Sequence, residues 1–312
     1  MREMDAPVSN IAVLVPCYNE AAAIAGVIRD FREALPHAAI HVFDNASSDD
    51  TAAIAREAGA IVHAVGLRGK GNVVRRMFAD VDADIFVLVD GDGTYDAASA
   101  PRLIELLRRG RCDMVVAARQ HTSSAAYRRG HVLGNHMLTG FLSWMFGRAC
   151  VDILSGYRVF SRRFVKSFPV LSAGFEIETE ITVHALELRV PIEEIETPYS
   201  ERSEGSESKL RTYRDGFRIL YTIVRLFSAE RPLMFYSTIA ALLALVSIVL
   251  MIPVAITYAE TGLVPRFPTA ILSTGLMLLA ALSFSAGGIL DTVTRGRREL
   301  KMLHYLAQRV PE

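Results

Sequence analysis

The chain has 312 residues, enough for one large domain or two smaller ones. Its 34 basic residues balance 34 acidic ones, so the overall charge provides no case for a nucleic-acid partner. The hydrophobic content of 51% is high and unevenly distributed, and the three scattered cysteines show no metal-ligand spacing and suit a reducing cytosol.

The N-terminal part of the chain alternates between strand and helix patterns. Helical patterns of about 10–15 residues, such as the one over residues 20–35, lie between short apolar runs. These runs have the composition of strands and cover residues 11–16, 39–44, 60–65, 84–90 and 112–119. The alternation predicts βαβ units and therefore an α/β fold with a doubly wound, mostly parallel sheet.

Polar residues stand where these predicted strands end. Asp44, Asp90 and Arg119 are the last residues of three of them. Because the ligands of such sheets gather at the carboxyl ends of the strands, we expect the three residues to belong to one site.

The strand over residues 84–90 runs into the sequence DGDG, which places Asp90 and Asp92 close together on a turn. Two such carboxylates can share Mg²⁺ or Mn²⁺ and leave ligand positions for phosphate oxygens. A calcium loop fits poorly, because Tyr95 stands where that loop needs glycine and because a strand precedes the motif. From these residues alone, an ordinary Asp-Gly turn stays the alternative.

The pattern changes from about residue 130 onward. A long apolar helix is predicted over residues 134–147, and strands and one further helix complete the sheet. Three alternating glutamates, Glu176, Glu178 and Glu180, fit either one face of a strand or the start of a helix, and Glu178 is favoured as facing the site. The Ser/Glu-rich stretch over residues 200–211 predicts a mobile loop.

The last third of the chain has the composition of a membrane segment. Residues 211–230 place apolar side chains on one helix face and arginines on the other, which is typical of a helix in the membrane interface; a surface helix over the sheet is the alternative. Residues 233–259 and 267–290 contain no charge, and each stretch is long enough to span about 30 Å of hydrocarbon. A pair of buried core helices would share this composition.

The flanking charges predict an orientation. Basic residues precede the first apolar stretch and follow the second, whereas the connecting loop offers only Arg266, so both termini are predicted to be cytoplasmic. The N-terminal sequence has no apolar signal region, which predicts an inner-membrane protein with a cytoplasmic catalytic part. The predicted domains are a catalytic part over residues 1–210, an interfacial helix over 211–230, two transmembrane helices over 231–292 and a cytosolic tail over 293–312.

Several short motifs occur in a fixed order along the chain. VPCYNEAAAI, FDNASSDDT, LRGKGNVVR and VDGDG together resemble the family 2 glycosyltransferases, which have the GT-A fold. The later sequences DILSGYRVFSRR, GFEIETEI and SERSEGSESKL narrow the resemblance to a branch similar to dolichyl-phosphate mannose and glucose synthases. The resemblance covers roughly residues 10–230.

This resemblance implies an inverting transfer of a hexose from a nucleotide sugar to a polyprenyl phosphate, with Mg²⁺ or Mn²⁺ as cofactor. UDP-glucose or UDP-GlcNAc is the favoured donor, and GDP-mannose is the alternative. Membrane lipid is an implied partner, and assembly as a homo-tetramer is implied by analogy alone. A processive polysaccharide synthase fits less well because the chain has no Q-x-x-R-W motif, while a nucleotide-sugar-binding membrane subunit without catalysis stays open.

The same resemblance assigns roles to residues. The predicted catalytic residues are Asp90, Asp92 and Arg158, and the predicted metal ligands are Asp92 and Asp90. The nucleotide sugar is predicted to contact Pro16, Tyr18, Glu20, Asp44, Lys70 and Asp90. Guanidinium groups bind phosphate in a bidentate manner, and the predicted acceptor-phosphate contacts are Arg119, Ser155, Arg158, Arg202 and Lys209.

Two positions depart from the family pattern. Some relatives carry Gln where this chain has Thr94, which is a poorer metal ligand, so the role of this position stays open. Many family 2 members carry a second Asp where this chain has Asn45.

Overall fold

The computed structural model describes residues 10–110, 112–121, 139–145, 147, 152–174, 176–200 and 212–308. It divides into two compact units, which we describe separately. The first contains Met1–Ile219 together with Lys301–Glu312, and the second contains Leu220–Leu300.

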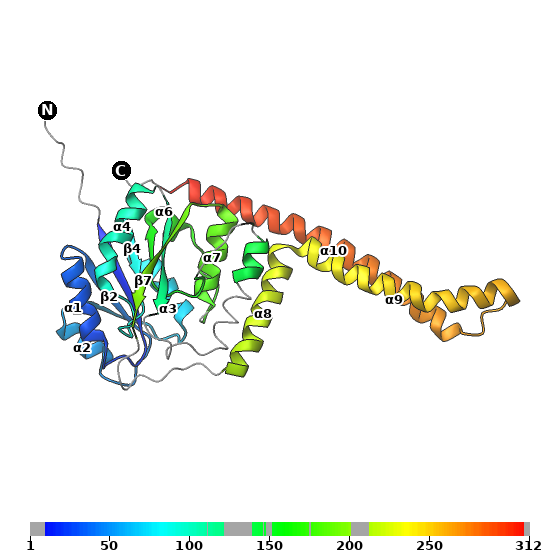
Figure 1. Cartoon of the computed structure of the whole chain (residues 1–312), viewed down its shortest axis with the longest axis horizontal. Helices are drawn as coiled ribbons and strands as arrows, with labels where there is room; N and C mark the ends of the chain where they lie inside the picture. The colour runs from blue at the N-terminus through cyan, green and yellow to red at the C-terminus, as the bar shows by residue number, and fades with distance from the viewer. Residues whose placement is uncertain are drawn as a thin grey trace, which may run out of the picture. The chain divides into compact units, whose positions relative to one another are not determined.

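The first unit is built on a seven-stranded sheet with the order β3-β2-β1-β4-β6-β5-β7 (Figure 1). The strands are β1 (Ile11–Cys17), β2 (Ala39–Asp44), β3 (Ile61–Ala64), β4 (Ile85–Leu88), β5 (Met114–His121), β6 (Arg158–Ser161) and β7 (Ile192–Tyr199). All neighbouring pairs are parallel except those of β6, which runs antiparallel to both β4 and β5. The predicted doubly wound, mostly parallel GT-A-like sheet is confirmed.

Helices cover both faces of this sheet. They are α1 (Ile24–Ala34), α2 (Thr51–Glu57), α3 (Lys70–Asp80), the short 3₁₀ helix η1 (Ala97–Ser99), α4 (Ala100–Arg109), α6 (Arg162–Ser167) and α7 (Ile177–Leu188). Successive side chains of a strand point to opposite faces, so β1 sends Val13 and Val15 to one core cluster and Leu14 to another. The first cluster packs against α1 and α4, and the second packs against α3, α6 and α7.

The antiparallel strand β6 follows from how the chain returns to the sheet. Strand β5 ends at His121 on the carboxyl edge, and the chain comes back to the sheet at Arg158. A strand that enters from the carboxyl edge must run toward the amino edge, which makes it antiparallel to its neighbours. This places the segment before Arg158 at the same edge as the ends of β1, β2 and β4.

The second unit holds the end of α8 (Thr212–Glu230), all of α9 (Pro232–Thr261) and most of α10 (Phe267–Leu306). Helices α9 and α10, of 30 and 40 residues, are long and apolar enough to cross a membrane. They pair antiparallel: Ser247 Oγ donates to the Ser273 carbonyl over 2.7 Å, and Ser273 Oγ donates back to the Ser247 carbonyl over 2.8 Å. A Cβ at Gly287 would lie 2.9 Å from the Cβ of Tyr236, so the helices pack closely there.

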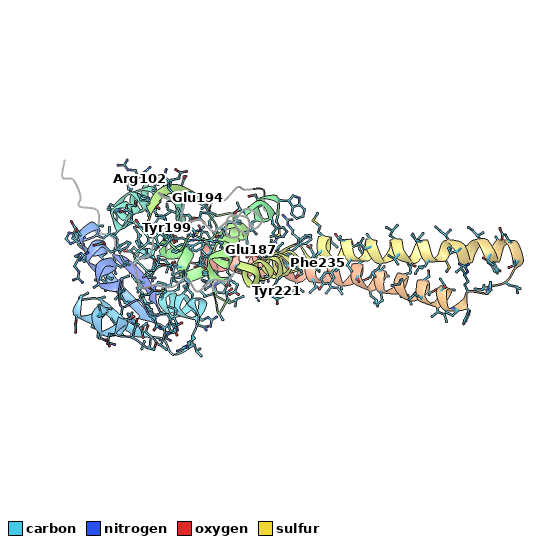
Figure 2. The ribbon with its side chains drawn as sticks, turned by 60° about the horizontal axis from the view of Figure 1, so that its bottom comes forward. Arg102, Glu187, Glu194, Tyr199, Tyr221 and Phe235 are labelled. Carbon is cyan, nitrogen blue, oxygen red and sulfur yellow. The ribbon has the colours of Figure 1, made fainter. Side chains whose placement is uncertain are left out.

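The outer surface of this hairpin is apolar. Most of the large hydrophobic side chains of α9 and α10 are exposed, among them Leu242, Ile252, Leu282 and Ile289. Figure 2 shows the side chains projecting from both helices along their length. This excludes the alternative of buried core helices within the described part of the chain.

The last turns of α10 belong to the first unit. Tyr305 is buried there, and its hydroxyl donates to Asp113 Oδ2 over 2.6 Å while the Arg163 guanidinium lies 4.2 Å from the centre of its ring. Lys301 Nζ donates to Glu187 Oε2 of α7 over 2.6 Å. The range predicted as a cytosolic tail is therefore helical as far as Leu306, and its last helical turns pack on the sheet unit.

Candidate active site

The predicted site residues gather at the carboxyl edge of the sheet. In the strand register Cys17 lies beside Asp44, and Leu88, two residues before Asp90, lies beside Leu14 and Arg158. The loops that follow β1, β2 and β4 therefore start next to one another. This is the edge at which ligands of such sheets bind.

Asp44 supplies a buried acceptor that lacks a partner among the described residues. Its Oδ2 accepts from the Ser47 backbone N–H over 3.3 Å, and its Oδ1 is enclosed without a hydrogen bond. A buried polar atom left in this state costs about 1–3 kcal/mol. A ligand that donates an N–H or O–H to Oδ1 removes that cost, and the bases and riboses of nucleotides carry such donors.

Asn45 holds the loop that leads to α3. Its amide nitrogen donates to the carbonyls of Val65 and Leu67, over 3.1 and 2.7 Å, and its Oδ1 accepts from the Gly69 N–H over 2.7 Å. An ionised Asp could make only the last of these bonds. The departure from Asp at this position thus has a structural reason.

The loop after β1 is fastened to the loop after β2. Asn19, with a φ of 54°, donates its N–H to Ser47 Oγ over 2.9 Å, and its Oδ1 accepts from the Ser48 N–H over 2.8 Å. The Glu20 N–H donates to Thr51 Oγ1 over 2.9 Å. These bonds fix the backbone of the predicted nucleotide contacts that follow β1.

Two other predicted nucleotide contacts lie nearby. Pro16 pairs with Phe43 in the strand register and is half-buried. The Tyr18 ring lies 5.2 Å from the Arg68 guanidinium carbon, a cation–π contact that brings the β1 loop to the LRGKG segment.

The DGDG turn is closely packed. A Cβ at Gly91 would lie 2.6 Å from the Cys17 sulfur, and a Cβ at Gly156 would clash with the Asp90 carboxylate. A side chain at either position would force the Cys17 or Asp90 side chain to move, so the turn packs closely against β1 and the segment before β6.

Thr94 orients the second carboxylate of the turn. Its hydroxyl donates to Asp92 Oδ1 over 2.7 Å, its N–H donates to the same oxygen over 3.2 Å, and both residues are buried. The Thr94 carbonyl accepts from the Ser200 N–H over 2.9 Å. Thr94 thus holds the Asp92 carboxylate in place through two hydrogen bonds.

Lys70 joins the GKG turn to the DGDG turn. Its Nζ lies 2.5 Å from Asp90 Oδ1 and is also hydrogen-bonded to Glu178 Oε1, in the first turn of α7. Burial acts to lower the pKa of Lys70, but the charges of Asp90 and Glu178 overcome it and hold that pKa above its ordinary value. Lys70 is therefore charged, and Glu178 is the glutamate that faces the site.

The two other glutamates of that segment lie around the start of α7. Glu180 accepts from the backbone N–H groups of Leu171 and Ser172, over 2.8 and 2.7 Å. Glu176 is the residue directly before the helix. The start of a helix, and not a strand face, is thus the correct interpretation of the alternating glutamates.

Arg119 is already paired inside the protein. Its Nε and Nη2 donate to the two carboxylate oxygens of Asp152, over 2.7 and 2.8 Å, and its guanidinium carbon lies 5.6 Å from the ring centre of Tyr199. Burial acts to raise the pKa of Asp152, but the hydrogen bonds and charge of Arg119 outweigh it and hold that pKa below its ordinary value. No sequence pattern points to Asp152, since no spacing links it to Arg119.

Arg158 and Ser155 are both fully buried. The Arg158 guanidinium donates to the carbonyls of Ser155 and Ile153, over 3.0 and 2.5 Å, and to Thr182 Oγ1 over 2.9 Å. Ser155 Oγ donates to the Ala117 carbonyl over 2.6 Å. In this structure both side chains shape the segment before β6, so direct contact with an acceptor phosphate stays a prediction for them. Arg202 and Lys209 lie outside the described residues.

The donor set of the DGDG turn suits a hard divalent cation. Among the described residues no group of three or more His, Cys, Asp or Glu side chains is arranged to hold a metal. Mg²⁺ is commonly bound by one or two carboxylates together with substrate phosphates. Asp90 and Asp92, on one closely packed turn, fit that arrangement when a diphosphate supplies the remaining oxygens.

Sequence comparison relates this chain to known proteins. The model of the family described as Glycosyl transferase family 2 matches residues 12–167. An uncharacterized protein of Shigella flexneri is 59% identical over 157 residues, which cover 50% of this chain and 96% of that protein. Glycosyltransferase AglJ of Haloferax volcanii is 34% identical over 231 residues, which cover 73% of this chain and 76% of that protein. The dolichyl-phosphate hexose transferase of the same species is 27% identical over 222 residues, which cover 71% of this chain and 96% of that protein.

Comparison with solved structures gives the same fold. The chain is similar to glucosyl-3-phosphoglycerate synthase from Mycobacterium tuberculosis, crystallised with Mn²⁺, UDP-glucose and phosphoglyceric acid. The TM-score is 0.59 at 24% sequence identity, and the match covers 70% of this chain and 79% of that one. At this level of identity the likeness concerns the fold.

Proposed function

The chain belongs to glycosyltransferase family 2, and we propose that it transfers a hexose from a nucleotide sugar to a polyprenyl phosphate. The proposal of a lipid acceptor rests on the hairpin of α9 and α10, whose large apolar side chains are mostly exposed. An exposed apolar surface of this extent needs a membrane or a partner to cover it. The similarity to the dolichyl-phosphate hexose transferase supports the same acceptor class.

The donor side of the proposal rests on the carboxyl edge of the sheet. The enclosed Oδ1 of Asp44 accepts from the base or ribose, and Pro16, Tyr18 and Glu20 frame that part of the site. Asp90 and Asp92 hold Mg²⁺ or Mn²⁺ against the diphosphate, beside the Lys70 ammonium. We favour a UDP-sugar, UDP-glucose or UDP-GlcNAc, over GDP-mannose as the donor.

The reaction proposed at this site is a direct displacement. An oxygen of the acceptor phosphate attacks the anomeric carbon while the bond from that carbon to the nucleoside diphosphate breaks, so the anomeric configuration inverts. The acceptor is already anionic at neutral pH and needs no strong general base. A divalent cation held by Asp90 and Asp92 would supply positive charge to offset the charge on the leaving diphosphate.

The acceptor phosphate must be brought close to another anion. We assign this task to Arg119, whose guanidinium is oriented by Asp152, and to Arg202 and Lys209. Arg158 and Ser155 contribute through the shape of the segment before β6, and their direct contact with phosphate belongs to the same proposal.

The membrane part of the proposal concerns orientation. Helices α9 and α10 cross the membrane, α8 lies in its interface, and the catalytic unit and both termini face the cytoplasm. The hairpin leaves from the sheet unit and returns to it at Lys301, which supports placing both ends on one side.

The test is a transfer assay with purified protein in vesicles that contain undecaprenyl phosphate. Labelled UDP-glucose, UDP-GlcNAc and GDP-mannose are offered separately with Mn²⁺. We expect a sugar-linked lipid from one UDP-sugar. Transfer from GDP-mannose alone would establish the mannosyltransferase alternative, and donor binding without any transfer would establish a non-catalytic subunit.

Loss of the second carboxylate of the DGDG turn gives the first specific prediction. Asp92→Ala removes a predicted metal ligand and should reduce transfer about 100-fold or more while the protein still folds. EDTA should abolish transfer by the wild-type protein, and Mn²⁺ should restore it. Full activity in EDTA would refute the metal assignment.

A further inference from the structure

The ion pair between Lys70 and Asp90 poses a problem for the donor site. If Asp90 holds a cation or the ribose, its carboxylate must leave or loosen its contact with Lys70. A buried ammonium that loses its partner is strongly destabilised. The protein therefore needs a second carboxylate that stays with Lys70 when Asp90 turns to the ligand.

Glu178 is a carboxylate that can stay with Lys70, because it is more deeply buried than Asp90. Its side chain is 8% exposed and that of Lys70 is 10% exposed, whereas that of Asp90 is 29% exposed. A ligand that arrives from solvent can thus reach Asp90 but not Glu178. Of the two partners of Lys70, one is accessible to a ligand and the other is enclosed.

The backbone around both residues is fixed by the segment over residues 171–174. Cβ atoms at Gly69 or Gly71 would clash with the carbonyls of Ala173 and Ser172, and the Gly71 N–H donates to the Gly174 carbonyl over 3.1 Å. This segment thus packs directly on the start of α3.

The same segment is tied to the start of α7. Its first two N–H groups donate to the Glu180 carboxylate, over 2.8 and 2.7 Å, and Thr182 Oγ1 donates to the Glu178 carbonyl over 2.9 Å. Lys70 and Glu178 therefore stand at the starts of two helices that this segment holds together, and their pairing does not depend on the DGDG turn.

We propose that Glu178 is a positioning residue that retains Lys70 when Asp90 is released to the cation and diphosphate of the donor. Without the Glu178 charge, Lys70 has only Asp90 as its buried partner and competes with the cation for that carboxylate. This inference rests on the proposed donor site. It predicts that Glu178 affects metal binding through Lys70.

The test measures binding of Mn²⁺ in the presence of UDP, without any acceptor, from the signal of free Mn²⁺ in electron paramagnetic resonance. Glu178→Gln should weaken Mn²⁺ binding about tenfold, the range expected when a hydrogen bond to a charged group is changed. Transfer by this variant should be restored by excess Mn²⁺. At saturating UDP, Lys70→Met should bind Mn²⁺ at least as tightly as the wild-type protein, although more UDP should be needed to reach saturation.

A variant with both Lys70→Met and Glu178→Gln distinguishes an effect of Glu178 through Lys70 from a direct electrostatic effect of Glu178 on the cation. In a Lys70→Met background, Glu178→Gln should have no further effect on Mn²⁺ binding, because the competitor is gone. An equal effect in both backgrounds would overturn the inference, as would wild-type Mn²⁺ affinity in Glu178→Gln. Glu105→Gln, an exposed carboxylate on α4, is the control for charge change and handling.

The binding measurements also distinguish a failure of the proposed function from a failure of the role assigned to Glu178. If the wild-type protein bound neither UDP nor Mn²⁺, the donor site and the role of Glu178 would both be refuted. If the wild-type protein bound both ligands and Glu178→Gln bound them equally well, only the role of Glu178 would be refuted. Should Glu178→Gln fail to fold, Lys70→Met alone decides, because weaker Mn²⁺ binding in that variant contradicts competition by Lys70.

Discussion

At the scale of single residues, the candidate site depends on side chains that orient the predicted ligands. Asp90 and Asp92 are visible in the sequence because two carboxylates on a turn have a known chemistry. The hydrogen-bonding roles of Thr94, Asn45 and Asp152 cannot be recognised in the sequence. Each of these residues bonds to a group that is distant in the sequence or that stands at no characteristic spacing from it. Sequence patterns predict ligands better than the residues that hold them.

Thr94 provides the first test at this scale. Thr94→Val keeps the side-chain volume but removes the hydrogen bond from Oγ1 to Asp92. We expect transfer to fall about tenfold, since hydrogen bonds to charged groups contribute about 1.5–3 kcal/mol. The measurement is the rate of transfer as a function of Mn²⁺ concentration, and unchanged kinetics would show that Asp92 does not need this support.

Asn45 provides a test of stability. Asn45→Asp removes both bonds that the amide nitrogen donates to the loop before α3. We expect the free energy of unfolding to fall by about 1–3 kcal/mol, measured by thermal or urea unfolding in detergent.

At the scale of elements, alternation along the chain predicts most of the sheet but not its order. Each of the five apolar runs in the N-terminal part becomes a strand, β1 to β5. The central strands β1 and β4 are apolar because both of their faces are buried, whereas β3 lies at the edge of the sheet and is partly exposed. The place of β6 between β4 and β5 depends on where residues 122–157 return the chain to the sheet, which no local pattern encodes. This placement decides that Arg158 is enclosed.

Helix α7 carries a buried histidine that makes stability depend on pH. His184 packs against Phe164 and Phe168, and neither ring nitrogen has a hydrogen-bond partner among the described residues. Burial, with a smaller contribution from Lys301, lowers the pKa of His184 to about 3, from an ordinary value of 6.5. The folded protein therefore keeps this imidazole neutral at pH values where the unfolded chain protonates it.

The sign of the effect follows from that difference. The contribution of neutral His184 to the free energy of unfolding is fully present above pH 6.5. It is lost as the pH falls from 6.5 toward 3, by about 1.4 kcal/mol per pH unit. His184→Leu should remove this part of the pH dependence. The check is a series of urea unfolding experiments between pH 7 and pH 4.5, and parallel curves for both proteins would contradict it.

At the scale of the whole molecule, the composition predicts two apolar helices and their flanking charges, and the structure contains helices over both stretches. Composition does not predict that residues after the second helix pack on the sheet unit. The contacts of Tyr305 with Asp113 and Arg163 join positions far apart in the chain, and aromatic or charged residues at a C-terminus are common. The charges that flank the second apolar stretch predict only a cytosolic tail over residues 293–312.

Removing a single oxygen atom tests the hydrogen bond between Tyr305 and Asp113. Tyr305→Phe removes the hydroxyl and leaves Asp113 with Ser161 and Arg163 as partners. We expect a loss of about 1–2 kcal/mol in the free energy of unfolding of the sheet unit, and faster protease cleavage near the C-terminus. Tyr258→Phe, at an exposed position on α9, is the matched control and should behave as the wild-type protein.

The docked end of α10 also bears on the order in which the protein is completed. Tyr305 is made 192 residues after Asp113, so the acidic group in the sheet waits for its partner while both apolar helices are synthesised. Chains grow at about 5–20 residues per second, which leaves a delay of roughly ten seconds or more. The sheet unit thus reaches its final packing only after both apolar helices have been synthesised.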